Sequence, residues 1–167
     1  MNAPAQPSDG GGKVVTRPAG LADCRRVFEW ANDPETRKAS FFDASIPLAD
    51  HERWYADSLD GDRRILRIAE VDATPVGLIR FDRDAKDPKT AEIGINMAPK
   101  HRDRGLAAPV LLAARRDAAT LGIRRLVARI RTENRRSIRA FERAEFVFVG
   151  AARVRGSDAA RYEIILD

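Results

Sequence analysis

The segment Arg102-Asp103-Arg104-Gly105-Leu106-Ala107 is the feature that most restricts how this chain can fold. It follows a strand-like apolar run, residues 91–97, and precedes a run with the apolar spacing of a helix, residues 106–121. Small residues at two close positions let backbone N–H groups approach a ligand, and the helix behind them directs its positive dipole end to the same place. Arg102 and Arg104 flank the turn with side chains suited to phosphate. Such a turn also simply starts many helices, so both interpretations stand on this segment alone.

The length and composition predict one folded domain. The chain has 167 residues, of which 44% are hydrophobic and 33% are charged, as is typical of a globular protein with a substantial core. No apolar stretch approaches the roughly 20 residues that span a bilayer, so we expect no membrane partner. Residues 1–13 are polar and rich in Pro and Gly, without the apolar core of a secretory signal. We therefore expect a disordered tail over residues 1–13 and one domain over residues 14–167.

The charge pattern restricts the partners. The formal net charge is +5, and 25 of the 30 basic residues are arginine, which fits either a phosphorylated ligand or a GC-rich codon bias. These residues are interspersed with 25 acidic ones and form no long basic arm, so we expect no nucleic-acid partner. The single cysteine, Cys24, excludes an internal disulfide and predicts a cytoplasmic location. No His, Cys or carboxylate spacing indicates a metal site.

Hydrophobic periodicity predicts a mixed order of elements. Strands are expected over residues 14–17, 64–71, 76–81, 91–97, 126–130, 146–151 and 161–166. Helices are expected over residues 21–31, 48–59, 106–121 and 134–143, with a loop over residues 35–47. Strands and helices alternate only in the second half of the chain. The pattern therefore predicts a single α/β domain with a mixed sheet.

Two motifs together resemble the GNAT superfamily of N-acetyltransferases. The strand, Arg102-x-x-Gly105-x-Ala107 and the helix are similar to its acetyl-CoA pyrophosphate loop. Residues 134–146, which read Asn-Arg-Arg-Ser-Ile-Arg-Ala-Phe-Glu-Arg-Ala-Glu-Phe, are similar to its Asn-x-x-Ser-x-x-x-Tyr/Phe-Glu-Lys/Arg-x-Gly-Phe signature. The resemblance runs from about Val14 to the C-terminus. It implies a mostly antiparallel sheet of about seven strands flanked by about four helices, and transfer of acetyl from acetyl-CoA to a primary amine.

A narrower resemblance concerns the acceptor. Residues 30–37, Trp-Ala-Asn-Asp-Pro-Glu-Thr-Arg, with Ser40-Phe41 and His51-x-x-Trp54, look like a subgroup that acetylates the 4-amino group of nucleotide-linked sugars. Similar segments occur in enzymes that acetylate protein N-termini and in antibiotic-modifying relatives. The preferred acceptor is thus a nucleotide-linked 4-amino sugar, with a protein N-terminus or another small-molecule amine as alternatives. A non-catalytic acyl-CoA sensor, and a monomer or a homodimer, also remain open.

The resemblance assigns roles in holding the coenzyme. The strand that ends at Ile95, Asn96 and Met97 would splay from the strand over residues 126–130, and pantetheine would pair with the freed backbone. A backbone N–H near Asn96 or Met97 would polarise the thioester carbonyl. The N–H groups of Arg102, Asp103, Arg104, Gly105, Leu106 and Ala107 would hold the pyrophosphate. Asn134 and Ser137 would contact the pantetheine arm, with Phe141 packed beside it.

The general base and the acceptor contacts are expected from residue type and position. Glu92 is the first candidate base, with a salt-bridged strand carboxylate as the alternative, and His51 is the second, with a structural histidine as the alternative. Acceptor contacts are expected from Trp30, Asn32, Arg37, Phe41, Trp54 and Arg80, unless these are core and surface residues. Two positions depart from the family pattern: Phe141 stands where a tyrosine acid is frequent, and Glu145 where glycine is usual, which predicts strain in that turn.

Overall fold

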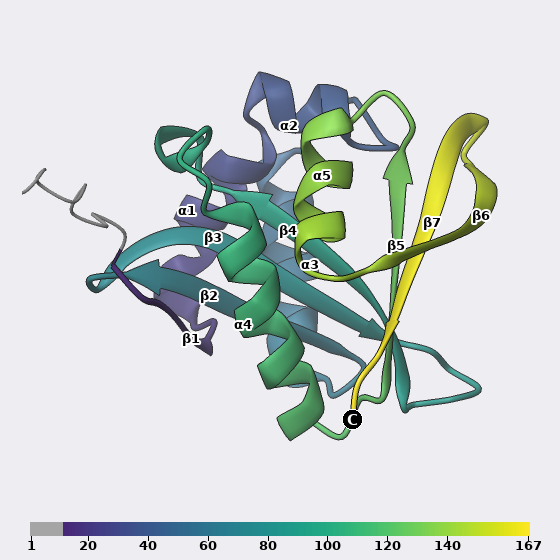
Figure 1. The fold of residues 1–167 in the computed structure, drawn as a ribbon. Helices are drawn as coiled ribbons and strands as arrows, with labels where there is room; N and C mark the ends of the chain where they lie inside the picture. The colour runs from purple at the N-terminus through teal and green to yellow at the C-terminus, as the bar shows by residue number, and fades with distance from the viewer. Residues whose placement is uncertain (1–11) are drawn as a thin grey trace, which may run out of the picture.

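A computed structural model describes residues 12–167, so the tail expected over residues 1–13 lies almost wholly outside the described residues. Within them, the chain forms a seven-stranded sheet of order β1-β2-β3-β4-β5-β7-β6 (Figure 1). All neighbouring strands are antiparallel except β4 and β5, which are parallel. The predicted mixed, mostly antiparallel sheet is confirmed. No helix of the described part has the length and apolar character needed to cross a bilayer.

The expected strands and helices are present, with ends that shift by a few residues. The strands are β1 Val14–Pro18, β2 Arg64–Val71, β3 Thr74–Arg83, β4 Thr90–Met97, β5 Arg125–Arg131, β6 Val147–Val154 and β7 Ser157–Ile165. The helices are α1 Cys24–Ala31, α2 Pro34–Ala39, α3 Leu48–Asp60, α4 Ala107–Thr120 and α5 Arg135–Arg143, with short 3₁₀ turns η1 Leu21–Asp23 and η2 Pro99–His101.

Helix α2 corrects the loop predicted over residues 35–47. The Asp33 carboxylate accepts hydrogen bonds from the backbone N–H of Glu35 at 3.1 Å and of Thr36 at 3.2 Å, and Pro34 occupies the first helical position. This arrangement favours a helix start for two reasons. The carboxylate accepts hydrogen bonds from two amides of the first turn that have no partner within the helix, and proline has no N–H at a position where an N–H would lack such a partner. The Asp-Pro pair thus ends one helix and begins the next.

Helices cover both faces of the sheet (Figure 1). On one face α4 and α5 pack into the main core through Val110, Leu111, Ile138 and Phe141. On the other face a smaller cluster joins Val27 of α1 and Tyr55 of α3 to Leu66, Ile68 and Leu78 of β2 and β3. The parallel pair β4 and β5 lies at the middle of the sheet, between these layers.

Candidate functional site

A groove of about 660 Å³ lies where β4 and β5 separate. These strands pair only over Thr90–Glu92 and Arg125–Val127, so residues 93–97 have no partner on β5. The groove is closed by α2 and by the start of α5. Its lining residues are Glu35, Thr36, Lys38, Ala39, Ser40, Ile95, Asn96, Met97, Arg102, Ala107, Arg131, Glu133, Asn134, Arg135, Arg136, Ser137 and Ala140. The splay predicted between these two strands is therefore present.

The free edge of β4 offers the backbone groups of alternate residues. Ala98 N donates to Val76 O at 2.8 Å, and Asp84 N donates to Thr90 O at 2.9 Å. These two hydrogen bonds show, at both ends of β4, which of its residues have backbone groups that face β3. Backbone groups alternate in direction along a strand. The N–H and C=O of Asn96 therefore point toward β3, and those of Ile95 and Met97 point into the gap between β4 and β5. The backbone donor expected at Asn96 or Met97 is thus available at Met97. The Asn96 amide faces β3, and Asn96 is itself among the residues that line the groove.

The turn before α4 presents main-chain donors. Asp103 and Gly105 adopt the left-handed conformation, with φ of 59° and 70°, so consecutive amides curve around one point. No side chain caps α4, and within residues 12–167 the amides of residues 103–106 donate to no other protein atom. A Cβ added to Gly105 would meet nothing within 4 Å. These features form an anion site at a helix N-terminus.

The two arginines of this turn behave differently, which corrects the expectation that both side chains face a phosphate. Arg102 is only 13% exposed, and it pairs with the Asp33 carboxylate at 2.6 Å and donates to Thr36 Oγ1 at 2.5 Å. Arg104 is exposed. Arg136 of α5 lies near both Glu35, at 3.6 Å, and Asp103, at 3.5 Å. Arg136, which lines the groove beside this turn, is therefore a guanidinium group placed to approach a bound anion.

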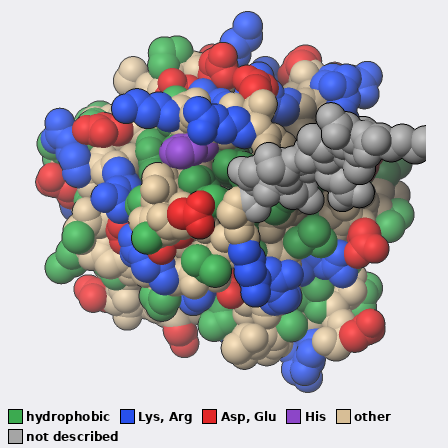
Figure 2. Space-filling view, turned by 60° about the vertical axis from the view of Figure 1, so that its left-hand side comes forward, with side chains coloured by type: hydrophobic (Ala, Val, Ile, Leu, Met, Phe, Trp, Pro, Cys, Tyr) green, Lys and Arg blue, Asp and Glu red, His purple; other side chains and the backbone are tan. Residues whose placement is uncertain are grey.

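The start of α5 contributes polar groups and more positive charge. Asn134 caps the helix by accepting from Ser137 N at 3.3 Å, and both residues line the groove. Arg131, Arg135 and Arg136 also line it, although sequence reasoning missed them. The available signal was the Arg-Arg pair inside the second motif. Figure 2 shows that elsewhere on the surface in view, Lys and Arg side chains are interspersed with Asp and Glu.

Phe141 lies in the core and not beside the groove. It is 3% exposed and stacks edge-to-face on Phe146, with ring centroids 4.9 Å apart. The expectation that Phe141 packs against the pantetheine arm is therefore wrong. The strain predicted at Glu145 is confirmed, because its φ is 69°, a value that side chains rarely adopt. Its carboxylate pairs with Arg115 of α4.

Neither predicted base is free in the groove. Glu92 pairs with Arg129 of β5 at 2.7 Å and lies outside the groove lining, as its alternative interpretation stated. His51 is 2% exposed, and its Nε2 lies 3.1 Å from the Cys24 carbonyl oxygen among the rings of Phe28, Trp54 and Tyr55. Burial lowers the pKa of His51 below its ordinary value of 6.5. The prediction of His51 as a base or substrate contact is wrong, and its role is structural.

Two predicted acceptor contacts hold a loop instead. The Asn32 side chain donates to Ile46 O at 3.0 Å and accepts from Ile46 N at 2.8 Å. Arg37 donates to Ala31 O at 2.6 Å and to Phe42 O at 2.7 Å. These contacts fix residues 40–46, the acceptor-side segment, which runs from α2 toward α3. The polar groups that the sequence offered for a substrate are thus largely used within the protein.

Two of the remaining acceptor candidates lie on the α1–α3 face of the sheet. Trp30 and Trp54 pack against the smaller core cluster, which agrees with the core alternative. Arg80 pairs with Asp82 at 2.8 Å. Its guanidinium packs over Gly94, because a Cβ added to that glycine would lie only 3.2 Å from it. Phe41 is half-buried in the acceptor-side segment. Of this set, Arg80 and Phe41 retain surface that a substrate can reach.

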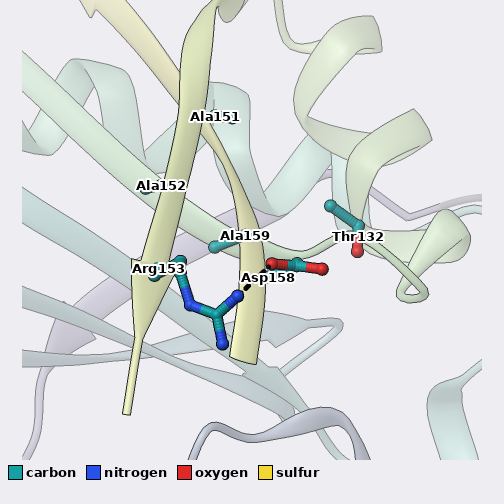
Figure 3. A pocket seen from close by; sticks show the side chains of 6 residues that line it. All are labelled: Thr132, Ala151, Ala152, Arg153, Asp158 and Ala159. Atoms are coloured by element: carbon teal, nitrogen blue, oxygen red, sulfur yellow. Dashed lines mark hydrogen bonds and ion pairs between the residues drawn. The ribbon is translucent and has the colours of Figure 1, made fainter. Parts of the chain in front are cut away.

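A second hollow of about 470 Å³ lies between the β6–β7 hairpin and Thr132 (Figure 3). Small side chains, Ala151, Ala152 and Ala159, form its wall, and Arg153 pairs with Asp158 at 3.1 Å across the hairpin. Its lining residues include neither cysteine nor histidine. Within the part of the chain that the structure describes, no three His, Cys, Asp or Glu side chains gather as a metal site would require.

Comparisons with known proteins agree with this geometry. Residues 13–147 match a family model described as an acetyltransferase (GNAT) domain. The fold is similar to that of the aminoglycoside acetyltransferase AAC(6')-Ib with paromomycin and acetyl-CoA, at a TM-score of 0.82 and 19% identity over 92% of this chain and 93% of that one. It is also similar to spermidine N-acetyltransferase from Vibrio cholerae with CoA and spermine, at a TM-score of 0.81 and 19% identity over 92% and 95%. No curated protein sequence matches the chain.

Proposed function

Because the chain belongs to the GNAT acetyltransferase family and is an acetyl-CoA-dependent N-acetyltransferase, we propose that its acceptor is an anionic primary amine, with a nucleotide-linked 4-amino sugar preferred. The observation that carries the proposal is the charge of the groove. Five basic residues line it, namely Lys38, Arg102, Arg131, Arg135 and Arg136, against two acidic ones, Glu35 and Glu133. Part of this charge faces the coenzyme, but Lys38 and Arg131 also border the acceptor-side segment, since Arg131 donates to the carbonyl oxygen of Ser40 at 2.9 Å. A polycationic amine would meet repulsion there, whereas an anionic one gains attraction and faster association.

The same groove holds the coenzyme. Acetyl-CoA, when bound, supplies an activated acetyl thioester. The backbone of Ile95 and Met97 would pair with its pantetheine arm, and the Met97 amide would donate to the thioester carbonyl oxygen. Amides of residues 103–107 and the α4 dipole would hold the pyrophosphate, with Arg136 lining the same groove. The residues present therefore fit this group without any change of fold.

The chain leaves proton transfer to solvent. Glu92 is paired away from the groove, Glu133 pairs with Arg131 at 3.2 Å, and Glu35 lies near Arg102 at 3.3 Å. Phe141 has no proton to give and is buried. An acceptor amine would therefore attack in its neutral form, having lost one proton to water. As the C–N bond forms and the C–S bond breaks, the nitrogen would release a second proton to water, and water would protonate the departing thiolate. Catalysis then comes from orientation and from the Met97 amide.

An acceptor panel tests the proposal. Thiol release from acetyl-CoA is measured with a nucleotide-linked 4-amino sugar, a peptide with a free N-terminus, kanamycin and spermine. We expect the highest kcat/KM with the nucleotide-linked sugar, and a pH–rate profile that follows the pKa of the acceptor amine. Preference for spermine or kanamycin would contradict the anionic acceptor, and preference for the peptide would support the protein N-terminus.

A further inference from the structure

Helix α2 is attached to both sides of the groove. At its N-terminus, Arg102 from the pyrophosphate turn contacts Asp33 at 2.6 Å and Thr36 Oγ1 at 2.5 Å. At its C-terminus, Arg131 of β5 donates to the carbonyl oxygen of Ser40 at 2.9 Å. The short helix therefore bridges the separating strands, and its position depends on residues that line the coenzyme groove.

A chain of hydrogen bonds continues from Arg102 to β4, the strand whose Met97 amide faces the gap. Thr36 Oγ1 accepts from Arg102 and donates to Asn96 Oδ1 at 3.2 Å. Asn96 precedes Met97, whose amide faces the gap. Although burial opposes it, hydrogen bonds from Arg102 and from Thr36 N hold the pKa of Asp33 below its ordinary value, so the Arg102–Asp33 pair stays charged. With a side chain only 13% exposed, Arg102 is far more restricted than an ordinary surface arginine.

Helix α2 in turn fixes the acceptor side. Arg37 donates from α2 to Phe42 O at 2.7 Å in the acceptor-side segment. Asn32, just before α2, holds Ile46 of the same segment through two hydrogen bonds. A shift of α2 therefore moves the segment that the acceptor must approach. The path from the pyrophosphate turn to this segment consists of direct contacts between Arg102, Asp33, Thr36 and Arg37.

We propose that Arg102 is a positioning residue that couples coenzyme binding to the order of the acceptor-side segment, residues 40–46. The inference rests on the proposed coenzyme site. Coenzyme A in the groove fixes the turn that carries Arg102, and Arg102 fixes α2 and, through Arg37, the segment. By linkage, an acceptor that orders the segment tightens coenzyme binding by the same factor.

Hydrogen exchange of the full chain, with and without coenzyme A, tests the coupling. In the wild type, coenzyme A slows amide exchange in residues 40–46 by roughly tenfold, the usual size of such couplings. Arg102→Gln at saturating coenzyme A loses this protection while keeping protection at the turn. Lys100→Gln is the matched control, because it removes the same charge from the exposed turn η2 just before Arg102, outside the groove lining, and it keeps protection in residues 40–46. Thr36→Val, altered on the α2 side, loses protection as Arg102→Gln does.

The outcomes separate this inference from the proposed function. Binding of coenzyme A without protection of residues 40–46 in the wild type, or full protection in a folded Arg102→Gln variant, overturns the coupling alone. No binding of coenzyme A to the wild type overturns the coenzyme site itself. If Arg102→Gln fails to fold, Arg102→Lys and Thr36→Val carry the test. Arg102→Lys keeps the charge without the two-pronged contact, so partial protection supports the proposal and full protection contradicts it.

Discussion

The two sides of the groove use their polar groups in opposite ways. On the coenzyme side, the amides before α4 and the β4 edge at Ile95 and Met97 have no partner in the described protein. On the acceptor side, Asn32 and Arg37 are already bonded to the protein. A backbone site is built by conformation and stays open until a ligand arrives. Side chains near a substrate can be used up by the loop that they support.

The strongest test of this comparison changes the backbone of the coenzyme side. Gly105→Val places a β-branched residue at φ 70°, which costs about 1–2 kcal/mol in that conformation and moves the turn. Coenzyme A affinity in calorimetry should fall roughly 10- to 100-fold. The matched control is Gly122→Val, at φ 79° and with equal open space but outside the groove, which should leave affinity unchanged. Equal losses in both variants would refute the site.

The next test concerns the acceptor side. His51→Leu removes the contact with the Cys24 carbonyl and leaves that oxygen without its partner. The free energy of unfolding, measured with urea, should fall by about 1–3 kcal/mol, while kcat of the folded variant stays near that of the wild type. A variant with full stability and lost acetyl transfer would instead restore His51 as a catalytic residue.

The same histidine predicts a pH dependence of stability. Its folded pKa lies below the unfolded value of about 6.5, so the unfolded chain binds more protons in that interval. The free energy of unfolding should therefore decrease as the pH falls from 7 through 6.5, and this slope should flatten in His51→Leu. A second loss belongs to Asp23, whose pKa its hydrogen bond with Arg17 lowers to about 2, and it occurs below pH 3.8. An unchanged slope in the variant would contradict the assignment.

A smaller effect on stability is expected at Glu145, in the turn that follows α5. Glu145→Gly removes the Cβ that strains the left-handed backbone conformation at this position. The substitution should raise the free energy of unfolding by about 1 kcal/mol. The exposed pair with Arg115 that is lost contributes little. Glu145→Ala is the control, because it removes the carboxylate but keeps the strained Cβ, and it should bring no gain. Thermal melts of both variants decide the matter, and equal gains would mean that charge is responsible.

The smallest expected change is at Glu92. Glu92→Gln keeps a hydrogen-bond partner for Arg129 and removes only the charge. We expect kcat to change less than about threefold, because loss of a general base costs roughly 10²–10⁴-fold. A loss in that larger range at saturating substrate would identify Glu92 as the base and contradict proton transfer to solvent.

The sequence predicts the coenzyme side of the groove better than the acceptor side. The glycine turn at Gly105 and the helix that begins near Asn134 are predictable from the sequence because local conformation and helix periodicity dictate them. Helix α2 was missed because Asp33-Pro34 both stops and starts a helix, and only the first signal was used. His51, Asn32 and Arg37 were assigned by residue type, but their partners are carbonyl groups far along the chain, which no local pattern reveals.

The central claim is that main-chain amides of residues 103–107 bind the pyrophosphate of coenzyme A. Calorimetric titration of the wild-type protein with coenzyme A and with pantetheine, which lacks the diphosphate, tests it most directly. The account predicts micromolar binding of coenzyme A and binding of pantetheine that is weaker by roughly 100-fold or more. Equal affinities, or no heat with coenzyme A, would contradict it.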